Sequence, residues 1–431
     1  MLAWASQASI FCCLDSQGYP ARAAWGYDCL LAVGAAGALE APAGSAFSQL
    51  KTWARDRRDW VFGHFAYDLA AETEPSGRGR SGEPFDHNGR QHKPDRIGFP
   101  GLYFFVPEIV IQLSPNAIRI GSLGSDQEAI WGQIRAFAAA PEDHPFAGDR
   151  PANGPKPAFQ PALTRAEYLD RVGAIQRDIL RGDCYELNFC QEFAACPVEL
   201  DPLRTWWSLG LASPNPYSCF YRLGERYLFC ASPECYLKKS GDKLLSQPIK
   251  GTAARFPGEP ATDQAARRWL AGSAKDRSEN VMVVDLVRND LSRVCSAGSV
   301  AVEELFGVHA FPQVFQMVST ISGRLRSGLE WPDAIAATFP MGSMTGAPKN
   351  RVVRLIECYE QQHRGIFSGA VGYVTPEGDF DFNVVIRSLL YNRADRFLSY
   401  QVGSGITFYS DPVSEYEECL LKAAGILRAL A

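Results

Sequence analysis

One lysine in this chain stands where a buried amine could act as a nucleophile. Lys250 lies in the string PIKGT (248–252), between a Pro-Ile pair and a Gly-Thr pair, with Leu244 and Leu245 shortly before it. Most lysines are solvated, and a solvated lysine on a turn is the ordinary interpretation of this string taken alone. If the amine is buried instead, desolvation lowers its pKa and makes it usable in covalent chemistry. The other motifs of the chain decide between these two interpretations.

Four carboxylates form two pairs at the i, i+3 spacing, which places side chains on one face of a helix. Asp276 and Glu279 continue an apolar row of a predicted helix, which is unusual because buried carboxylates need a partner. Glu415 and Glu418 repeat the spacing near the start of the last predicted helix. Acids are also common in the first turn of a helix, and Glu418 can form an exposed pair with Lys422. Two such pairs suit a hard cation such as Mg²⁺, which prefers oxygen ligands.

Nine sequence blocks in residues 160–431 occur in an order typical of one enzyme family. The blocks are GDCYELNFCQ (182–191), ASPE (231–234), PIKGT (248–252), SAKDRSENVMVVDLVRNDL (273–291), FPMGSMTGAPK (339–349), SGAVGY (368–373), VVIRSL (384–389), GSGI (403–406) and SEYEECLLK (414–422). Together they resemble the chorismate-utilising enzymes, which include anthranilate, isochorismate, salicylate and aminodeoxychorismate synthases. An ordered set of blocks is far more specific than any single motif.

Lys250 narrows the resemblance to one branch of this family. Anthranilate synthases have alanine at this position, whereas a lysine resembles component I of the aminodeoxychorismate synthases. The resemblance implies that Lys250 attacks ring carbon C2 of chorismate while Glu234 donates a proton to the departing 4-hydroxyl, which requires a raised pKa of Glu234. Ammonia from a separate glutamine amidotransferase subunit then adds at C4. The expected product is 4-amino-4-deoxychorismate, for p-aminobenzoate and folate biosynthesis.

The same resemblance implies a metal site and a substrate site. Mg²⁺ would be held by Glu279 and Glu418, with Asp276 and Glu415 as closer or outer support, and would hold the ring carboxylate of chorismate. Backbone amides of a glycine-containing loop would bind an anion, and an arginine within an apolar strand would clamp the enolpyruvyl carboxylate. The residues expected around the substrate are Glu186, Thr345, Gly346, Ala347, Tyr373, Arg387, Gly403, Gly405 and Lys422, with the charge of Lys349 nearby.

Two positions depart from the family pattern. Glu186 stands where glutamine is usual and where isochorismate and salicylate synthases have lysine, which argues against those two activities and leaves its own role open. Gln316 stands where histidine is frequent, and in anthranilate synthases that histidine is associated with elimination of pyruvate. His309 does not obviously replace it. We therefore expect amination without aromatisation; the alternatives are an anthranilate synthase component I and a non-catalytic chorismate-binding homologue.

These side chains require particular elements to position them. Thr164 and Glu167 form a capping box that starts a helix, and a strand is predicted at 184–193. The loop that ends in GAPK is predicted to enter a helix with Pro348 at its first position. Strand runs and helical runs with long-range pairing favour an α+β fold. The family fold implied by the resemblance has antiparallel β-sheets stacked as a sandwich, with helices packed outside and the active site between the sheets.

Two segments rich in glycine or proline divide the chain. Residues 74–100 are predicted to be a long loop, and residues 141–161, with six prolines, an extended connection. The second segment separates an N-terminal α+β region, residues 1–150, interleaved with the core, from a chorismate-binding catalytic region, residues 160–431. Within the first region, GHFAYDLAAETE (63–74) is predicted to be a strand-to-helix core element.

Composition places the chain in an ordinary class. The 431 residues carry a net charge of −5, so we expect no general attraction to nucleic acid or to anionic lipid. The twelve cysteines show no CxxC spacing, and reduced thiols are expected. No basic segment precedes the apolar N-terminus, and the longest apolar run, 29–39, is too short to cross a bilayer. We expect a soluble cytoplasmic protein that binds neither nucleic acid nor membrane.

Overall fold

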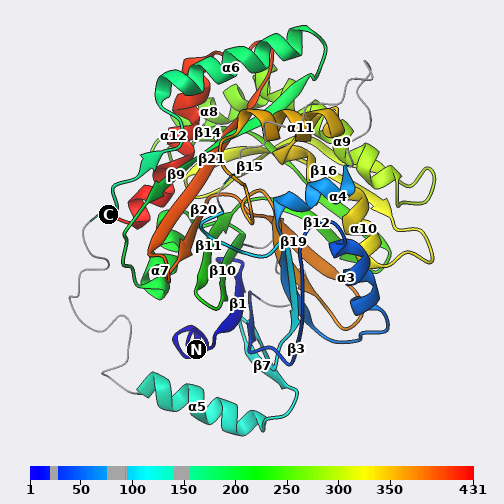
Figure 1. Ribbon diagram of the computed structural model, residues 1–431, viewed down its shortest axis with the longest axis vertical. Coiled ribbons are helices and arrows are strands. Elements are labelled where there is room, and N and C mark those ends of the chain that lie inside the picture. Colours follow the sequence, from blue (N-terminus) through cyan, green and yellow to red (C-terminus); the bar gives the residue numbers. More distant parts are fainter. Residues whose placement is uncertain (20–27, 75–92, 94, 140–155) are drawn as a thin grey trace.

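The computed structural model describes residues 1–19, 28–74, 93, 95–139 and 156–431 (Figure 1). Most of the predicted loop at 74–100 and most of the predicted connection at 141–161 lie outside the described residues. Among the described helices, none combines the length and the apolar character needed to cross a membrane. All twelve cysteines are free thiols.

The first β-sheet is antiparallel and contains the strand that carries Glu186. Its strand order is β17-β9-β21-β20-β11-β10-β1-β2-β6-β7, and β8 pairs with β9 outside this path. The strands are β1 (Ile10–Asp15), β2 (Cys29–Val33), β6 (Ile109–Ser114), β7 (Ala117–Ser122), β8 (Gln160–Pro161), β9 (Glu186–Ala195), β10 (Tyr217–Leu223), β11 (Arg226–Ser232), β17 (Gly346–Ala347), β20 (Ser388–Asn392) and β21 (Phe397–Ile406).

The second sheet is also antiparallel and contains the strand that carries Lys250. Its strand order is β14-β16-β13-β12-β19-β18-β4-β5-β3, with β15 pairing β16 outside this path. The strands are β3 (Gly37–Ala41), β4 (Val61–Phe65), β5 (Leu102–Val106), β12 (Cys235–Ser240), β13 (Lys243–Gln247), β14 (Ile249–Ala254), β15 (Ala301–Ala310), β16 (Val314–Arg324), β18 (Ala370–Val374) and β19 (Phe380–Val384). Each sheet therefore combines strands from before residue 150 with strands from after residue 160.

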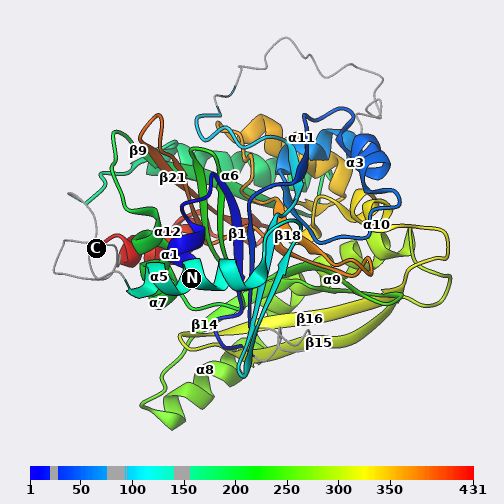
Figure 2. The same cartoon turned by 90° about the horizontal axis from the view of Figure 1, so that it is seen from below.

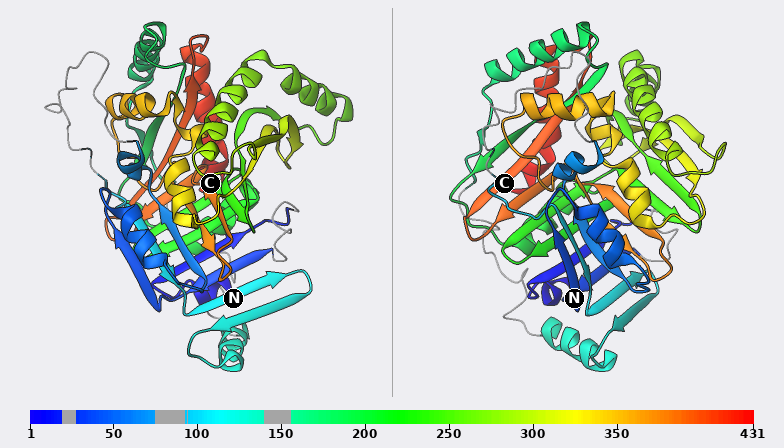
Figure 3. Two further views of the ribbon diagram at one scale, coloured as in Figure 1. Left: turned by 90° about the vertical axis from the view of Figure 1, so that its right-hand side faces the viewer. Right: turned by 45° about the vertical axis from the view of Figure 1, so that its right-hand side comes forward.

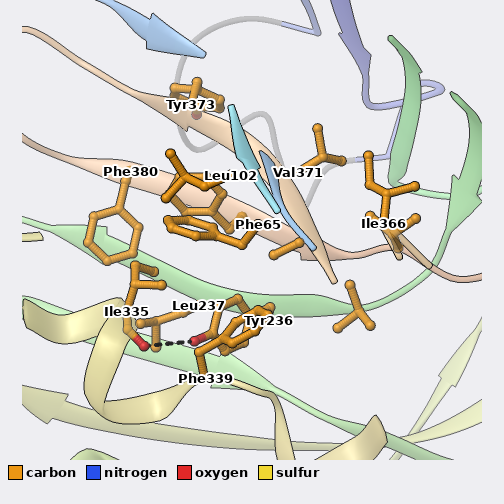
Figure 4. Packing of buried hydrophobic residues seen from close by; sticks show 14 of the residues in the cluster. Phe65, Leu102, Tyr236, Leu237, Ile335, Phe339, Ile366, Val371, Tyr373 and Phe380 are labelled. Atoms are coloured by element: carbon orange, nitrogen blue, oxygen red, sulfur yellow. Dashed lines mark hydrogen bonds between the residues drawn. The ribbon is translucent and has the colours of Figure 1, made fainter. Parts of the chain in front are cut away.

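The largest hydrophobic core lies between the two sheets. Its buried side chains come from strands of both, such as Cys12, Leu30 and Leu228 of the first sheet and Phe62 and Phe382 of the second. Figure 4 shows part of this packing on the second sheet, where the hydroxyl of Tyr236 interacts with the backbone of the neighbouring helix. The predicted fold class, an α+β sandwich of antiparallel sheets with helices outside, is confirmed.

Helices cover the outer faces of the sandwich (Figures 1 and 2). A second hydrophobic cluster joins the first sheet to α1 (Leu2–Ala5), α5 (Gln127–Ala139), α6 (Arg165–Leu180), α7 (Pro202–Ala212), α11 (Lys349–Tyr359) and α12 (Pro412–Ala429). The second sheet is flanked by α3 (Ala46–Ala54), α8 (Pro260–Gly272), α9 (Ala274–Ser292) and α10 (Trp331–Thr338). The short helical elements η1 (Tyr67–Leu69), α4 (Ala70–Thr73) and η3 (Gly342–Met344) complete the described set (Figure 3).

Three local predictions are confirmed. The helix α6 starts at the capping box of Thr164 and Glu167, in which each side chain bonds the backbone of the other. The predicted strand at 184–193 is β9, displaced by two residues to Glu186–Ala195. The segment 63–74 is strand β4 followed by η1 and α4, as its sequence predicts.

Candidate active site

The candidate site lies where the two sheets meet the helices α9 and α12. Gly405, on β21, marks its base because a side chain there has no space. A Cβ built at Gly405 would lie 2.7 Å from Glu186 Oε1, 2.9 Å from Lys250 Nζ and 3.5 Å from Glu279 Oε2. Three charged groups from β9, β14 and α9 therefore converge on one backbone position, and glycine allows their approach.

Lys250 lies in strand β14 and not on a turn. The ladder between β14 and β16 is irregular between Ile249 and Thr252, so Lys250 and Gly251 form a bulge. Gly251 has φ +94°, and a Cβ there would lie 2.9 Å from the side chain of Asp276. The bulge turns the lysine toward β9, where its Nζ donates to Glu186 Oε1 at 2.6 Å. The solvated-turn interpretation is wrong, since 11% of the lysine side chain is exposed.

The expected lowered pKa of Lys250 is also wrong. Burial alone would lower the pKa of the amine, but the charges of Glu186, Glu279 and Glu234 outweigh burial and raise it. Glu186 contributes twice, through its charge and through the hydrogen bond to Nζ. Lys250 is therefore an ammonium in the free protein, and it must lose a proton before it can act as a nucleophile.

Glu234 lies between β11 and β12 and is buried, with 4% of its surface exposed. Glu234 is therefore not a solvated turn residue. Burial raises the pKa of Glu234 to about 7, although Ser343, Lys250 and Lys422 partly oppose this rise. A carboxyl with this pKa carries a proton in about half of the molecules at neutral pH and can donate it. The raised pKa that a general acid requires is thus present.

Three carboxylates from two helices surround one ammonium group. Nζ of Lys275, on α9, lies 2.9 Å from Glu415 Oε1, 3.9 Å from Glu279 Oε1 and 4.0 Å from Glu418 Oε2. We call Glu279, Glu415 and Glu418 the three-carboxylate cluster. The fourth predicted acid, Asp276, lies in the first turn of α9 with its side chain against Gly251, outside the ion pairs of Lys275.

The three-carboxylate cluster could hold a cation through two of its members. Among the described residues, no group of three or more His, Cys, Asp or Glu side chains is arranged to hold a metal ion. Mg²⁺ usually takes only one or two protein carboxylates and completes its shell with water or substrate oxygens. Glu279 Oε1 and Glu415 Oε2 are buried without a hydrogen-bond partner. Burial also raises the pKa of Glu279 to about 7, against the opposing charge of Lys250. The donor set therefore fits a hard divalent cation.

Arg387 lies between strands and not inside one. It follows the end of β19 at Val384 and precedes β20 at Ser388, with φ +53°. The ladder stops here because the amide of Ile386 bonds to the carbonyl of Val384 instead of to a neighbouring strand. Burial lowers the pKa of the Arg387 guanidinium, which the charge of Glu418 opposes. Within the described part of the chain, no carboxylate lies within 4 Å of this guanidinium, so it can receive an acidic ligand.

In the loop before α11, the structure contradicts one part of the predicted anion site, the amide of Thr345. The amide of Thr345 donates to Gly342, and its hydroxyl donates to Met341. Gly346 and Ala347 form strand β17 against β9, and Ala347 accepts a bond from Tyr185. The loop aligns β9 beside the site, and anion binding by the amides of Gly346 and Ala347 stays a prediction.

Lys349 contributes no free charge to this loop. Its buried ammonium lies 2.5 Å from Asp290 Oδ2 and also donates to the carbonyl of Thr338. Burial raises the pKa of Asp290 to about 6, and the charge of Lys349 opposes this rise. Pro348 is the N-cap of α11 and not its first helical residue. The ion pair of Lys349 with Asp290 therefore joins the start of α11 to α9.

The remaining predicted residues divide between site and core. Tyr373 is buried in the core, with its ring 5.8 Å from that of Trp60 and 6.0 Å from that of Phe62, so its prediction as a pocket residue is wrong (Figure 4). Lys422 binds Glu418 Oε1 at 2.7 Å and the carbonyl of Gly403 at 2.8 Å. Lys422 thus joins α12 to β21 beside the three-carboxylate cluster. Gly403 packs closely against Cys190, which lies where a Cβ of residue 403 would project.

Gln316 lies beside the lysine-bearing strand. Its Cα pairs with that of Thr252, two residues after Lys250, and its side chain is buried with Oε1 lacking a hydrogen-bond partner. His309 pairs with Gln316 along β15 but is half exposed and binds Glu304 at 2.9 Å. His309 therefore does not supply the titratable group that Gln316 lacks.

Two features of the site went unrecognised in the sequence. Arg364 and Glu360 form a fully buried pair, with N–O distances of 2.6 Å and 2.9 Å. Arg364 also donates to the carbonyls of Met344 and Asn188, so it ties the loop before β17 to β9. Their i, i+4 spacing was the available signal.

The second feature is Lys275, which lies in the same motif as Glu279, four residues before it.

Comparison with known proteins agrees with this geometry. The family model described as chorismate binding enzyme matches residues 11–428. The chain therefore belongs to the family of chorismate-binding enzymes.

Individual relatives narrow the comparison. Aminodeoxychorismate synthase of Streptomyces pristinaespiralis is 35% identical over 399 residues, which cover 86% of this chain and 54% of the relative. Aminodeoxychorismate synthase component 1 of Escherichia coli K12 is 39% identical over 272 residues, which cover 63% of this chain and 59% of the relative. The chain thus spans little more than half the length of these relatives. The crystal structure of anthranilate synthase component I from Streptococcus pneumoniae is 25% identical with a TM-score of 0.77, over 92% of this chain and 91% of that chain.

Proposed function

We propose that this chain aminates chorismate at ring carbon C4 and yields 4-amino-4-deoxychorismate, the precursor of p-aminobenzoate in folate biosynthesis. The observation that carries the proposal is the position of Lys250, whose Nζ donates to Glu186 at 2.6 Å and whose charge acts on the buried Glu234. The similarity to aminodeoxychorismate synthases supports the same assignment. Ammonia would come from a glutamine amidotransferase subunit.

The first half of the reaction forms a covalent adduct. Glu186 Oε1 is the nearest acceptor of Lys250 and takes its proton, which frees the lone pair of Nζ. Nζ then bonds to C2, the C1–C2 double bond moves to C1–C6, the C5–C6 double bond moves to C4–C5, and the C4–O bond breaks. Glu234 gives its proton to the departing hydroxyl, which leaves as water. After this half, Glu186 is protonated and Glu234 is a carboxylate.

The second half reverses the displacement with ammonia. Ammonia bonds to C4, the C4–C5 double bond returns to C5–C6 and the C1–C6 double bond to C1–C2, and Nζ of Lys250 leaves from C2. Glu234 recovers a proton from the new ammonium at C4, and Lys250 recovers its proton from Glu186. Both acids regain their starting states, and the balance is chorismate plus ammonia giving the amino product plus water.

Binding of the substrate would use the charges around this centre. Mg²⁺ at Glu279 and Glu418, with Glu415 as support, would hold the ring carboxylate of chorismate and offset the negative charge there. Arg387, whose guanidinium has no carboxylate within 4 Å among the described residues, would bind the enolpyruvyl carboxylate. Lys422 contributes positive charge beside Gly403.

One turnover experiment tests this proposal against its alternatives. The protein is mixed with chorismate, Mg²⁺ and an ammonium salt, and the product is followed by mass, fluorescence and assay of pyruvate. We expect an aminated product that retains the enolpyruvyl group. Fluorescent anthranilate with released pyruvate would instead identify an anthranilate synthase, to which the structure is also similar. Absence of turnover would identify a non-catalytic homologue.

A further inference from the structure

Lys275 has an arrangement that the proposed reaction does not use. Its ammonium faces all three members of the three-carboxylate cluster, at 2.9 Å from Glu415 and within 4.0 Å of Glu279 and Glu418. Glu415 is almost fully buried, whereas 46% of the Lys275 side chain is exposed. The lysine therefore reaches into the cluster from the solvent side.

The position of Lys275 on its helix is unfavourable for helix stability. Ser273 caps α9 by accepting a bond from the amide of Asp276, so Lys275 is the second residue of the first turn. The N-terminal end of a helix carries partial positive charge, and cations are disfavoured there. The carboxylates, and not the helix, hold the ammonium in place.

The two other lysines near the three-carboxylate cluster, Lys422 and Lys250, form different contacts. Lys422 bonds to Glu418 and to the carbonyl of Gly403, and Lys250 bonds to Glu186. Lys275 pairs with all three members of the three-carboxylate cluster, whereas Lys422 pairs with Glu418 alone. Three carboxylates this close repel one another unless a cation lies among them.

We propose that Lys275 occupies the cation position of the three-carboxylate cluster when no divalent cation is bound, and that Mg²⁺ must displace its ammonium in order to bind. The inference rests on the proposed function, because that function introduces Mg²⁺. An ammonium and a divalent cation repel each other at short distance, so the same carboxylates cannot hold both closely. The flexible four-carbon stem and the exposure of Lys275 let the ammonium move into solvent without a change in α9.

Competition of this kind sets the concentration of cation that the protein requires. Every divalent cation that binds must replace an ion pair that already exists, so the apparent affinity is weaker than that of the carboxylates alone. Couplings between two such binding events typically amount to about 5- to 150-fold in affinity. Removal of the lysine charge should therefore tighten cation binding.

Direct titration with Mn²⁺ in the absence of chorismate tests this inference without any measurement of activity. Free Mn²⁺ is followed by electron paramagnetic resonance for the wild type, K275M, K275R and K243M. K275M keeps the length of the stem and removes the charge, and it should bind Mn²⁺ at least about fivefold more tightly. K275R keeps the charge and should bind like the wild type. K243M is the matched control, because Lys243 is a surface lysine that pairs with Glu303 at 2.6 Å, away from the cluster.

Thermal unfolding gives a second measure. In chelator, K275M should unfold at a lower temperature than the wild type, because Lys422, which pairs with Glu418 alone, then offsets only part of the repulsion of the three carboxylates. Mg²⁺ should raise the unfolding temperature of K275M more than that of the wild type. K275Q serves the same comparison if K275M does not fold.

The outcomes separate this inference from the proposed function. Unchanged or weaker Mn²⁺ binding by K275M, in a wild type that does bind Mn²⁺, would overturn the inference and leave the proposed function intact. If neither the wild type nor K275M binds Mn²⁺ and chorismate turnover needs no divalent cation, the proposed metal site falls and the inference with it. Mn²⁺ binding by K275M alone supports the inference in its strongest form.

Discussion

Lys250 and Glu186 join the two sheets of the sandwich at the base of the site. Nζ of Lys250 extends from β14 in the second sheet, and Oε1 of Glu186 lies 2.6 Å away on β9 in the first. Both side chains are largely buried, so the charge of Glu186 acts strongly on the amine. Among the charges that raise the pKa of the proposed nucleophile, that of Glu186 has the largest effect.

Replacement of Glu186 by glutamine should lower the pKa of Lys250. Glutamine preserves the shape of the side chain but removes the charge and the charged hydrogen bond that raise this pKa. Loss of a nearby opposite charge typically changes a pKa by about 1–3 units. The rate of adduct formation with chorismate, measured against pH, should begin to rise at lower pH in E186Q than in the wild type, and its maximum should be lower because Glu186 also accepts the proton of Lys250 in the proposed reaction. A coincident pH profile would show that Glu186 does not control the amine.

Lys250 should form a covalent adduct when ammonia is withheld. With chorismate and Mg²⁺ alone, the wild type should gain the mass of chorismate less one water, because the first half of the reaction expels the 4-hydroxyl. K250A should show no gain in mass, and K239A, which removes a lysine bound to Asp379 away from the site, should react normally. A wild type that stays unmodified yet aminates chorismate would indicate direct attack by ammonia.

Glu234 should impose a pH limit on both rate and stability. Its pKa is raised to about 7 by burial, so the proton that it donates is lost as pH rises through 7, and the rate should fall there. The native state holds this proton between pH ~4.5 and ~7 while the unfolded chain does not, so stability falls as pH rises through this window. The cost is about 3 kcal/mol at most for a pKa raised by this amount.

E234Q removes both effects. It should aminate chorismate slowly at every pH because it cannot donate a proton. It should also gain stability relative to the wild type as pH rises from 5 to 8 in denaturant titrations. A rate that keeps its decrease near pH 7 in E234Q would assign that titration to another group.

The local elements could be predicted from sequence because their signals lie close together along the chain. The capping box of α6 spans Thr164 to Glu167, and the alternation of β9 is complete within ten residues. The i, i+3 carboxylates also reach one site because helical spacing places each pair on one face. Glu279 is buried there as its position in an apolar row predicts, whereas the burial of Glu415 was not predicted.

Errors arose where a partner distant in sequence decides the outcome. The raised pKa of Lys250 depends on Glu186, which belongs to the other sheet. The ammonium of Lys349 forms an ion pair with Asp290, 59 residues earlier in the chain. Tyr373 follows a glycine in its motif. Whether an aromatic residue of a strand faces a pocket or the core depends on what packs against that face of the strand. Tyr373 faces the hydrophobic core (Figure 4). None of these relations has a local signal.

The proposed metal ligands should show themselves in the cation requirement. E279Q or E418Q removes a charged oxygen from the three-carboxylate cluster and should raise the Mg²⁺ concentration for half-maximal amination by about tenfold or more. Far-ultraviolet circular dichroism should show that both variants fold. E417Q is the matched control, since Glu417 is the exposed neighbour of Glu418 on α12. Equal Mg²⁺ requirements in E279Q, E418Q and E417Q would show that Glu279 and Glu418 do not bind the cation.

The identity of the product should depend jointly on Lys250 and Gln316. Lys250 would occupy C2 and direct the amine to C4, whereas anthranilate requires amination at C2 followed by loss of pyruvate. Gln316 pairs with Thr252, two residues after Lys250, and its side chain has no titratable nitrogen that could assist the loss of pyruvate. Each residue differs from the pattern of anthranilate synthases, so neither single change supplies both requirements. Q316H should therefore still release the C4-aminated product, because its lysine continues to block C2.

The double variant K250A/Q316H gives the sharper comparison. It frees C2 for ammonia and places a titratable ring beside the same strand, so any product that it makes should include fluorescent anthranilate and an equal amount of pyruvate. The measurement is fluorescence with a coupled pyruvate assay, at saturating ammonium and Mg²⁺, for the wild type, both single variants and the double variant. Pyruvate released by the wild type would contradict the assignment of C4 amination. Pyruvate released by Q316H alone would show that Lys250 does not direct the incoming amine, and that position 316 by itself separates the two products.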